Sequence, residues 1–235
     1  MHPMSTPAGA LDNPVYEALR GPHAHFAQVR GRVRRYVPDV APFLGLPVQP
    51  SAEDWQDAAG LVEPGTFAGL LGGSGLPDGW RAVQEFGVVQ MTGERVAGAA
   101  APGALALGAD DVDDMLELVA ETNPGPFLKR TVELGDYLGF RHEGVLVAMA
   151  GERLRVDGWA EISAVCTKPG HQGKGLATQL MGALVEGIRG RAELPFLHVL
   201  SDNTGAIRLY EQLGFRVRKS ETITVVTPAA AATEA

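Results

Sequence analysis

The chain has almost no cysteine, and this absence limits what can hold it together. Cys166 is the only cysteine among 235 residues, so no disulfide can form within the chain. Such a low cysteine content fits a protein of the reducing cytosol. The sequence also lacks an apolar run of the ~18 residues that a bilayer-spanning helix needs. Residues 1–7 have neither the basic nor the apolar region of a secretion signal. We therefore expect a cytoplasmic protein without a membrane segment.

An excess of basic residues is missing as well. Acidic residues outnumber basic ones by 28 to 20, which gives a formal net charge of −8. Because nucleic-acid phosphates attract clustered Lys and Arg, we do not expect nucleic acid as the main partner. The six histidines are scattered without cysteine or carboxylate clusters, which argues against a zinc site. An acidic chain does permit a cationic or amine substrate.

The most informative feature is a glycine-spaced segment directly after a hydrophobic run. The run EISAVC (161–166) leads into a turn at Pro169–Gly170, and QGKGLA (172–177) then opens a stretch with helical periodicity. Free N–H groups and the helix dipole favour an anion at such a helix start. Glycines let the backbone approach the phosphates because they carry no Cβ. The pattern therefore predicts a diphosphate site and a phosphorylated cofactor.

Two common phosphate loops do not fit this segment. A Walker loop needs Lys and Ser or Thr after its second glycine, but Leu176 follows Gly175. A dinucleotide fingerprint needs a third glycine at the position of Thr178. The plain alternative is that the glycines only form a tight turn.

The glycine segment resembles the acyl-CoA signature of the GNAT N-acetyltransferase superfamily, Gln/Arg-x-x-Gly-x-Gly/Ala. A second block follows at the family's spacing: FLHVL (196–200), then DNTGAIRLYEQLGF (202–215), similar to the family's last helix and the strand after it. The resemblance covers roughly residues 104–226 and extends to glycine N-acyltransferase-like members. It implies an α/β fold, with a mixed sheet that splays between two neighbouring strands to admit acetyl-CoA (coenzyme A).

A linker is predicted at residues 96–103, VAGAAAPG, which are small and show no periodicity. We expect residues 1–100 to form a partial or degenerate GNAT-like segment without a cofactor loop, and residues 101–227 to form the acetyltransferase domain. Residues 228–235 are expected to be a disordered tail. In the first segment we predict a hairpin around Arg30–Gly31, a helix at 52–59 and a strand at 80–90.

Beyond the linker the pattern alternates strands and helices. Strands are predicted at 104–107, 137–141, 145–155, 161–167, 196–200 and 215–226. Helices are predicted at 110–122, 175–189 and 203–213, with a helical turn at 131–134.

The resemblance also implies catalytic roles. Family members commonly use direct attack by the amine, with a carboxylate as base, often through water. Glu161 has the spacing of such a base, and we expect partial burial to raise its pKa. A solvent-facing glutamate is the alternative, and Glu143 and Glu152 are weaker substitutes. Tyr210 stands where the family places the phenol that protonates the leaving thiolate, although ordinary packing also accounts for it.

Cofactor contacts are expected along the loop and the last helix. Backbone groups of the strand before the loop should bind the acyl and pantetheine portion as an added strand would. Asn203 could equally be a helix cap, and Cys166 fits a small hydrophobe better than a nucleophile. Many members of the family have Arg at the position of Gln172. Here Gln172 has a neutral amide, so Lys174 is the single cation of the segment QGKGLA (172–177). The expected cofactor-binding residues are Val165, Cys166, Thr167, Gln172, Gly173, Lys174, Gly175, Leu176, Ala177, Asn203 and Ala206.

These observations predict an acyl-CoA-dependent N-acyltransferase that transfers acetyl from acetyl-CoA to a primary amine of a small molecule or amino acid. One alternative is a transferase of larger acyl groups. Another is an acyl-CoA-binding sensor or pseudoenzyme, which a substrate groove plugged by residues 1–100 would support. A third is an interaction module that keeps the fold without a ligand. No motif in the sequence identifies the acceptor. The sequence also leaves the oligomeric state open, with a homodimer as one option.

Overall fold

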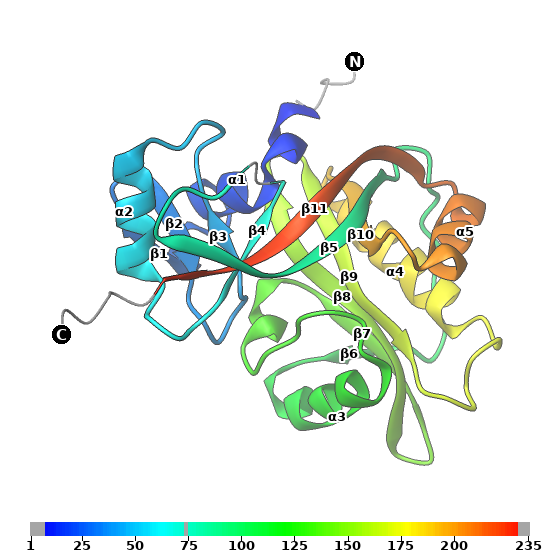
Figure 1. Ribbon diagram of the computed structural model, residues 1–235. Coiled ribbons are helices and arrows are strands. Elements are labelled where there is room, and N and C mark those ends of the chain that lie inside the picture. Colours follow the sequence, from blue (N-terminus) through cyan, green and yellow to red (C-terminus); the bar gives the residue numbers. More distant parts are fainter. Residues whose placement is uncertain (1–7, 73–74, 230–235) are drawn as a thin grey trace.

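The computed structural model describes residues 8–72 and 75–229, so residues 230–235 of the expected tail lie outside the described part. Its main feature is a mixed sheet of eight strands in the order β4-β11-β5-β10-β9-β8-β7-β6 (Figure 1). The strands of this sheet are β4 (Ala68–Leu71), β5 (Trp80–Thr92), β6 (Leu105–Leu107), β7 (Tyr137–His142), β8 (Val145–Val156), β9 (Trp159–Thr167), β10 (Leu194–Leu200) and β11 (Arg216–Pro228). A small sheet holds β1 (Ala27–Arg30), β2 (Val33–Tyr36) and β3 (Leu44–Gly45).

Helices cover both faces of the large sheet. The α-helices are α1 (Pro14–Arg20), α2 (Ala52–Leu61), α3 (Val112–Thr122), α4 (Leu176–Gly190) and α5 (Thr204–Leu213). Short 3-10 turns are η1 (Ala8–Asp12), η2 (Ala24–Phe26), η3 (Ala109–Asp111) and η4 (Thr131–Leu134). In Figure 1 the small sheet and α2 lie on the left, and α4 and α5 lie on the right.

The alternation of side chains along β10 shows how the faces are divided. Leu197 and Val199 pack in the core under α4 and α5, whereas Phe196 packs on the opposite face in a core with α1 and the small sheet. A third core, beneath α3, includes Cys166 of β9 and Tyr137 of β7. The core under α1 and the core under α3 are thus separate clusters.

Strands β9 and β10 run parallel, pair over a short length and then diverge. Their pairing covers only Trp159 to Glu161 against Leu194 to Phe196. Beyond that point β10 pairs with β5 and β9 pairs with β8. The register of β8 and β9 shifts between Met149 and Gly151, next to Ala164, whose φ is 53°. The predicted splay between neighbouring strands is therefore present, with a β-bulge on β9 just beyond the last pair.

Strand β5 lies inside the large sheet although it precedes the expected linker. It pairs with β10 from Val88 to Thr92 and with β11 along its whole length. The sheet therefore continues across residues 96–103, which form a loop between β5 and β6. Of the first hundred residues, three strands within 27–45 make the small sheet, and the strands at 68–71 and 80–92 belong to the large one.

The predicted helices and hairpins are confirmed, with small shifts at their ends. The hairpin at Arg30–Gly31 and the helix at 52–59 are both present, and Ser51 caps the latter through a capping box with Asp54. Helix α3 begins later than predicted, at Val112, because η3 forms first and the Asp111 carboxylate accepts a bond from the Gly108 N–H. Pro228 belongs to β11, so the expected tail overlaps the last strand. Within the described residues, the helices are too short or too polar to cross a membrane.

Candidate functional site

The loop at 168–175 joins β9 to α4, and its glycines have the backbone conformation that only glycine adopts freely. Gly170, Gly173 and Gly175 have φ values of 84°, 73° and 75°. A Cβ added to any of the three would meet no atom within 4 Å. These glycines therefore shape the loop and leave its outer side open.

Helix α4 begins at this loop with no side-chain cap. Its first intrahelical bond runs from the Gln179 N–H to the Gly175 carbonyl, 3.1 Å away. The N–H groups of Leu176 and Ala177 therefore belong to the first turn, where a helix leaves its donors for other partners. Open space, uncapped donors and the positive end of the helix together fit a diphosphate.

The side chains of the loop differ in how free they are. Lys174 is exposed and has no ion pair within the described ranges, so it can meet a phosphate. Lys168 is held by Glu121 at 2.7 Å. Gln172 turns back on β9, where its amide donates to the Thr167 carbonyl at 3.3 Å. Lys174 is thus the cation best placed for an anionic ligand.

Beyond Glu161, strand β9 pairs only with β8 in the described part of the chain. Val165 and Thr167 are half-buried and Cys166 is buried. Strand β9 can thus accept an extended ligand along its unpaired side, as an added strand. Burial raises the pKa of the Cys166 thiol, which does not suit a nucleophile.

Tyr210 and Asn203 come from α5 and its start. Burial raises the pKa of Tyr210 to about 12, with a smaller contribution from the Cys166 thiol, so the phenol keeps its proton at neutral pH. Its ring packs against Phe215 at 6.2 Å, and within the described residues its hydroxyl has no hydrogen-bond partner. Asn203 is a helix cap, since its side chain accepts the Ala206 N–H at 3.1 Å. That bond occupies the donor which Ala206 could offer a cofactor.

Glu161 lies at the last β9–β10 pair, fully buried and ion-paired. Its carboxylate accepts two bonds from Arg153, at 2.6 and 2.9 Å, and one from the Leu154 N–H at 3.2 Å. Burial alone would raise its pKa, but Arg153 and His198 outweigh burial and lower the pKa to about 2. The expectation of a raised pKa is therefore wrong, because the charged partners come from neighbouring strands.

His198 of β10 is the second member of this buried group. Its Nδ1 lies 2.7 Å from Glu161, and its Nε2 lies 3.1 Å from Gln90 and 3.3 Å from Glu221. The Gln90 amide is oriented by Arg218, which donates to its oxygen, and by the Leu11 carbonyl, which accepts from its nitrogen. Gln90 therefore favours an unprotonated Nε2, whereas Glu221 favours a protonated one.

The charge on His198 follows from these contacts. Burial lowers its pKa, but the bonds to Glu161 and Glu221 more than compensate and raise the pKa above its ordinary value of 6.5. Leu11 of η1 joins the group through Gln90, so the N-terminal segment covers it. The residues that these bonds connect are named the buried cluster: Arg153, Glu161, His198, Gln90 and Glu221.

Sequence reasoning missed Arg153, His198 and Gln90. A usable signal was present for His198, which interrupts the otherwise apolar strand β10. The weaker candidates do not join the cluster: Glu143 lies in the exposed β7–β8 turn, and Glu152 is held by Arg191 at 2.7 Å. No group of three or more His, Cys, Asp or Glu side chains in the described ranges is placed to hold a metal ion.

Comparisons with known proteins identify the family. Residues 137–224 match the family of FR47-like proteins. The uncharacterised N-acetyltransferase YobR of Bacillus subtilis is 36% identical over 61 residues, which is about a quarter of each chain. A GCN5-related N-acetyltransferase from Kribbella flavida shares the fold, with a TM-score of 0.61 at 18% identity over 96% of this chain and 97% of that one.

A crystal structure from Novosphingobium aromaticivorans, assigned to the GNAT family of acetyltransferases, is much more similar. It is 35% identical, with a TM-score of 0.86, over 98% of this chain and 100% of that chain. At this coverage the match extends into the first hundred residues. The chain therefore belongs to the GNAT family of acyl-CoA-dependent N-acetyltransferases.

Proposed function

We propose that the protein transfers the acetyl group of acetyl-CoA to a primary amine of a small molecule or amino acid. The observation that carries this proposal is the end of β9–β10 pairing at Glu161, followed by a three-glycine loop at the uncapped start of α4. Acetyl is chosen because the matched relatives are described as acetyltransferases. When bound, acyl-CoA supplies an acyl group that is activated as a thioester.

The loop and β9 are proposed to hold the cofactor. First-turn N–H groups of α4 and the Lys174 ammonium would bind the diphosphate. The unpaired side of Val165, Cys166 and Thr167 would align the extended arm, and the bulge at Ala164 would turn a backbone group toward the acyl oxygen.

Proton movement is proposed to use Tyr210 and the buried cluster. Tyr210 remains a phenol at neutral pH and can donate its proton to the leaving sulfur. Glu161 is ill-suited to accept the amine's proton directly, since its pKa is about 2 and its oxygens are occupied. We assign it the positioning of His198, which would accept the proton in its neutral form, above its folded pKa, and through water because its side chain is only 3% exposed.

Calorimetric titration with acetyl-CoA tests the proposal, with longer acyl-CoAs and NAD as comparisons. We expect micromolar binding of acetyl-CoA and none of NAD, followed by thiol release in an amine screen. Chain-length preference then decides between acetyl and larger acyl donors. If protein shown to be folded by circular dichroism binds no acyl-CoA, the proposal fails.

Tyr210→Phe separates the chemical role of the phenol from its packing. We expect turnover to fall by about 10²-fold, the lower range for general acid catalysis, with little change in acetyl-CoA affinity. Tyr16→Phe on α1 is a matched control that should leave turnover unchanged. Undiminished turnover at saturating donor, with chemistry shown to limit the rate, would remove Tyr210 from the acid role.

A second candidate function is an acyl-CoA-binding sensor. One observation favours it: residues of η1 cover the buried cluster, through the Leu11 carbonyl on Gln90 and the Asp12 carboxylate on Arg218. A sensor would bind acetyl-CoA in the titration yet release no thiol with any amine. An acetyltransferase would do both.

A further inference from the structure

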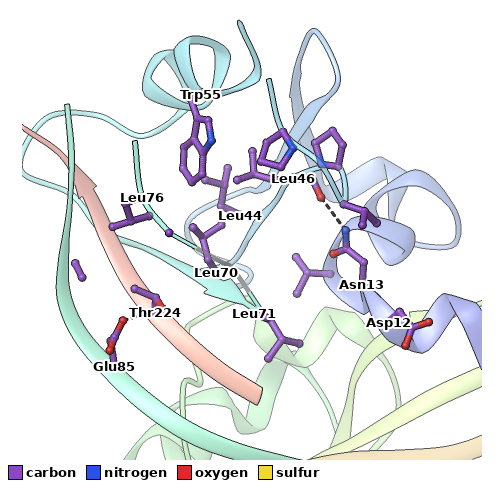
Figure 2. Close-up of a pocket in the computed structure, with 17 residues that line it drawn as sticks. Asp12, Asn13, Leu44, Leu46, Trp55, Leu70, Leu71, Leu76, Glu85 and Thr224 are labelled. Carbon is purple, nitrogen blue, oxygen red and sulfur yellow. Dashed lines mark hydrogen bonds between the residues drawn. The ribbon is translucent and has the colours of Figure 1, made fainter. Parts of the chain in front are cut away.

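A pocket of about 390 Å³ lies between the small-sheet region and the β5–β11 strand pair, away from the glycine loop (Figure 2). This volume falls in the range of small-molecule sites. Trp55 of α2, Leu44 of β3 and Leu70 of β4 stand on one side in Figure 2, and Glu85 of β5 lies with Thr224 of β11 on the other.

The greater part of the lining is apolar. Leu44 and Leu70 are buried, whereas Leu46, Leu76 and Trp55 are half-buried and so present surface to the pocket. Trp55 is held in place by Trp80, whose ring centroid lies 5.3 Å away. An aromatic face among leucines suits an apolar body and stacks readily on a ring or alkyl chain.

The charge at the pocket is negative and partly uncompensated. Among the described residues that line it, there is no Lys, Arg or His. Asp12 at one side is paired with Arg218 at 2.6 Å. Glu85 has only a bond from the Thr224 hydroxyl at 3.4 Å, and no cation pairs with it in the described part of the chain. The Glu85 carboxylate would therefore attract a positively charged group of a ligand and repel a negatively charged one.

The pocket is separate from the transfer site. Glu85 precedes Gln90 by five residues on β5, which places them roughly 17 Å apart at about 3.4 Å per residue. Gln90 in turn contacts His198 of the buried cluster. An ammonium group beside Glu85 therefore lies away from the point where β9 and β10 diverge.

We propose that this pocket binds a small amphiphilic amine, with its apolar body against Trp55 and the leucines and its ammonium group beside Glu85. The ligand occupies a second site, distinct from that of acyl-CoA.

Calorimetric titration of the full chain with octylammonium chloride, below its micelle concentration, tests this site. Octanoate and 1-octanol serve as probes of equal length with opposite and no charge. We expect saturable binding with octylammonium tightest and octanoate weakest. Octanoate binding as tightly as octylammonium, or no saturable binding by folded protein, overturns the proposal.

Two variants locate the cation. Glu85→Gln should weaken octylammonium binding about fivefold and leave 1-octanol unaffected, as expected for one exposed ion pair. Glu94→Gln, an exposed glutamate outside the pocket, should change neither affinity. An unchanged octylammonium affinity in Glu85→Gln would contradict the assignment.

The octylammonium titration is finally repeated in the presence of saturating acetyl-CoA. Octylammonium affinity should be the same with and without it if the two sites are distinct. Competition between the two would place the amine at the transfer site and would overturn the proposal of a second one.

Discussion

The glycine loop and the buried cluster lie at opposite ends of β9, and they differ in nearly every physical respect. Glycines 170, 173 and 175 are exposed, with open space where a side chain would be. Glu161 is fully buried, and both of its oxygens accept hydrogen bonds from other strands. One end of the strand is built to receive a ligand, whereas the other is already satisfied by the protein.

The glycine loop and the buried cluster depend on the rest of the chain in different ways. The loop's properties are local, because a positive φ and an uncapped helix start involve only adjacent residues. The cluster's properties are tertiary, because Arg153, His198 and Glu221 come from three other strands. Substitutions at the two ends should therefore fail in different ways: loss of stability at the cluster and loss of ligand binding at the loop.

Glu161→Gln should have the largest effect. It leaves the Arg153 guanidinium buried without its counter-charge, which costs about 3–5 kcal/mol in the free energy of unfolding. Urea unfolding followed by circular dichroism measures this loss. Adding Arg153→Met should restore part of it, since the uncompensated charge is then gone.

The matched control is Glu133→Gln, which breaks the exposed Arg130–Glu133 ion pair. Its unfolding free energy should stay close to that of the unmodified protein, because solvent screens this pair. Equal losses at Glu161 and Glu133 would contradict the distinction between cluster and surface.

Gly175→Trp should act at the other end of β9 and mainly on binding. The new side chain enters the open space of the loop, at a position where φ is 75° and α4 begins. We expect acetyl-CoA affinity to fall by at least tenfold in calorimetric titration, with a stability loss of roughly 1–2 kcal/mol from the left-handed backbone.

Gly65→Trp is the control for that backbone cost. Gly65 also has a positive φ, at 82°, and open space around its Cβ position, but it lies outside the loop. It should lose similar stability and retain acetyl-CoA affinity. If Gly175→Trp retained full affinity for acetyl-CoA, the assignment of the diphosphate site would be wrong.

The smallest expected effect is a pH dependence set by His198. Its pKa is raised in the fold, so its contribution to stability is complete below its ordinary pKa of 6.5 and is lost as pH rises through the folded value. Burial lowers the pKa of His23 to about 4, so that residue is neutral throughout this range. The free energy of unfolding should therefore decline as pH rises above 6.5 and through the folded pKa of His198.

Urea unfolding at several pH values in that window measures the decline. His198→Gln should flatten it, whatever its effect on absolute stability, whereas His25→Gln at an exposed site should leave it intact. Stability that rises with pH in the unmodified protein would refute the assignment.

Much of the fold could be predicted from the sequence because the signals are local. Helix caps such as Ser51 and Asn203, turn glycines and the periodicity of α4 depend on neighbours in the chain, and the elements are present where those signals place them. Strand order depends on distant partners, so the insertion of β5 between β10 and β11 had no signal in the alternation of residues 80–92.

The same limit applies to the site. The glycine loop was found because its residues are contiguous. The pKa of Glu161 was predicted in the wrong direction because the strand pairing brings Arg153 of β8, and then His198 of β10, within hydrogen-bond distance of the carboxylate. No pattern within β9 carries that information.

The position of β5 has a consequence for how the chain is made. Residues 80–92 leave the ribosome well before the strands on both sides of them, which begin at Leu194 and Arg216. Until then the buried segment from Val88 to Met91 has no partner on either edge. Pairings so distant in sequence form slowly and late. The centre of the sheet therefore closes last, and a nascent chain that stalls before β11 exposes the very strand on which both halves of the sheet depend.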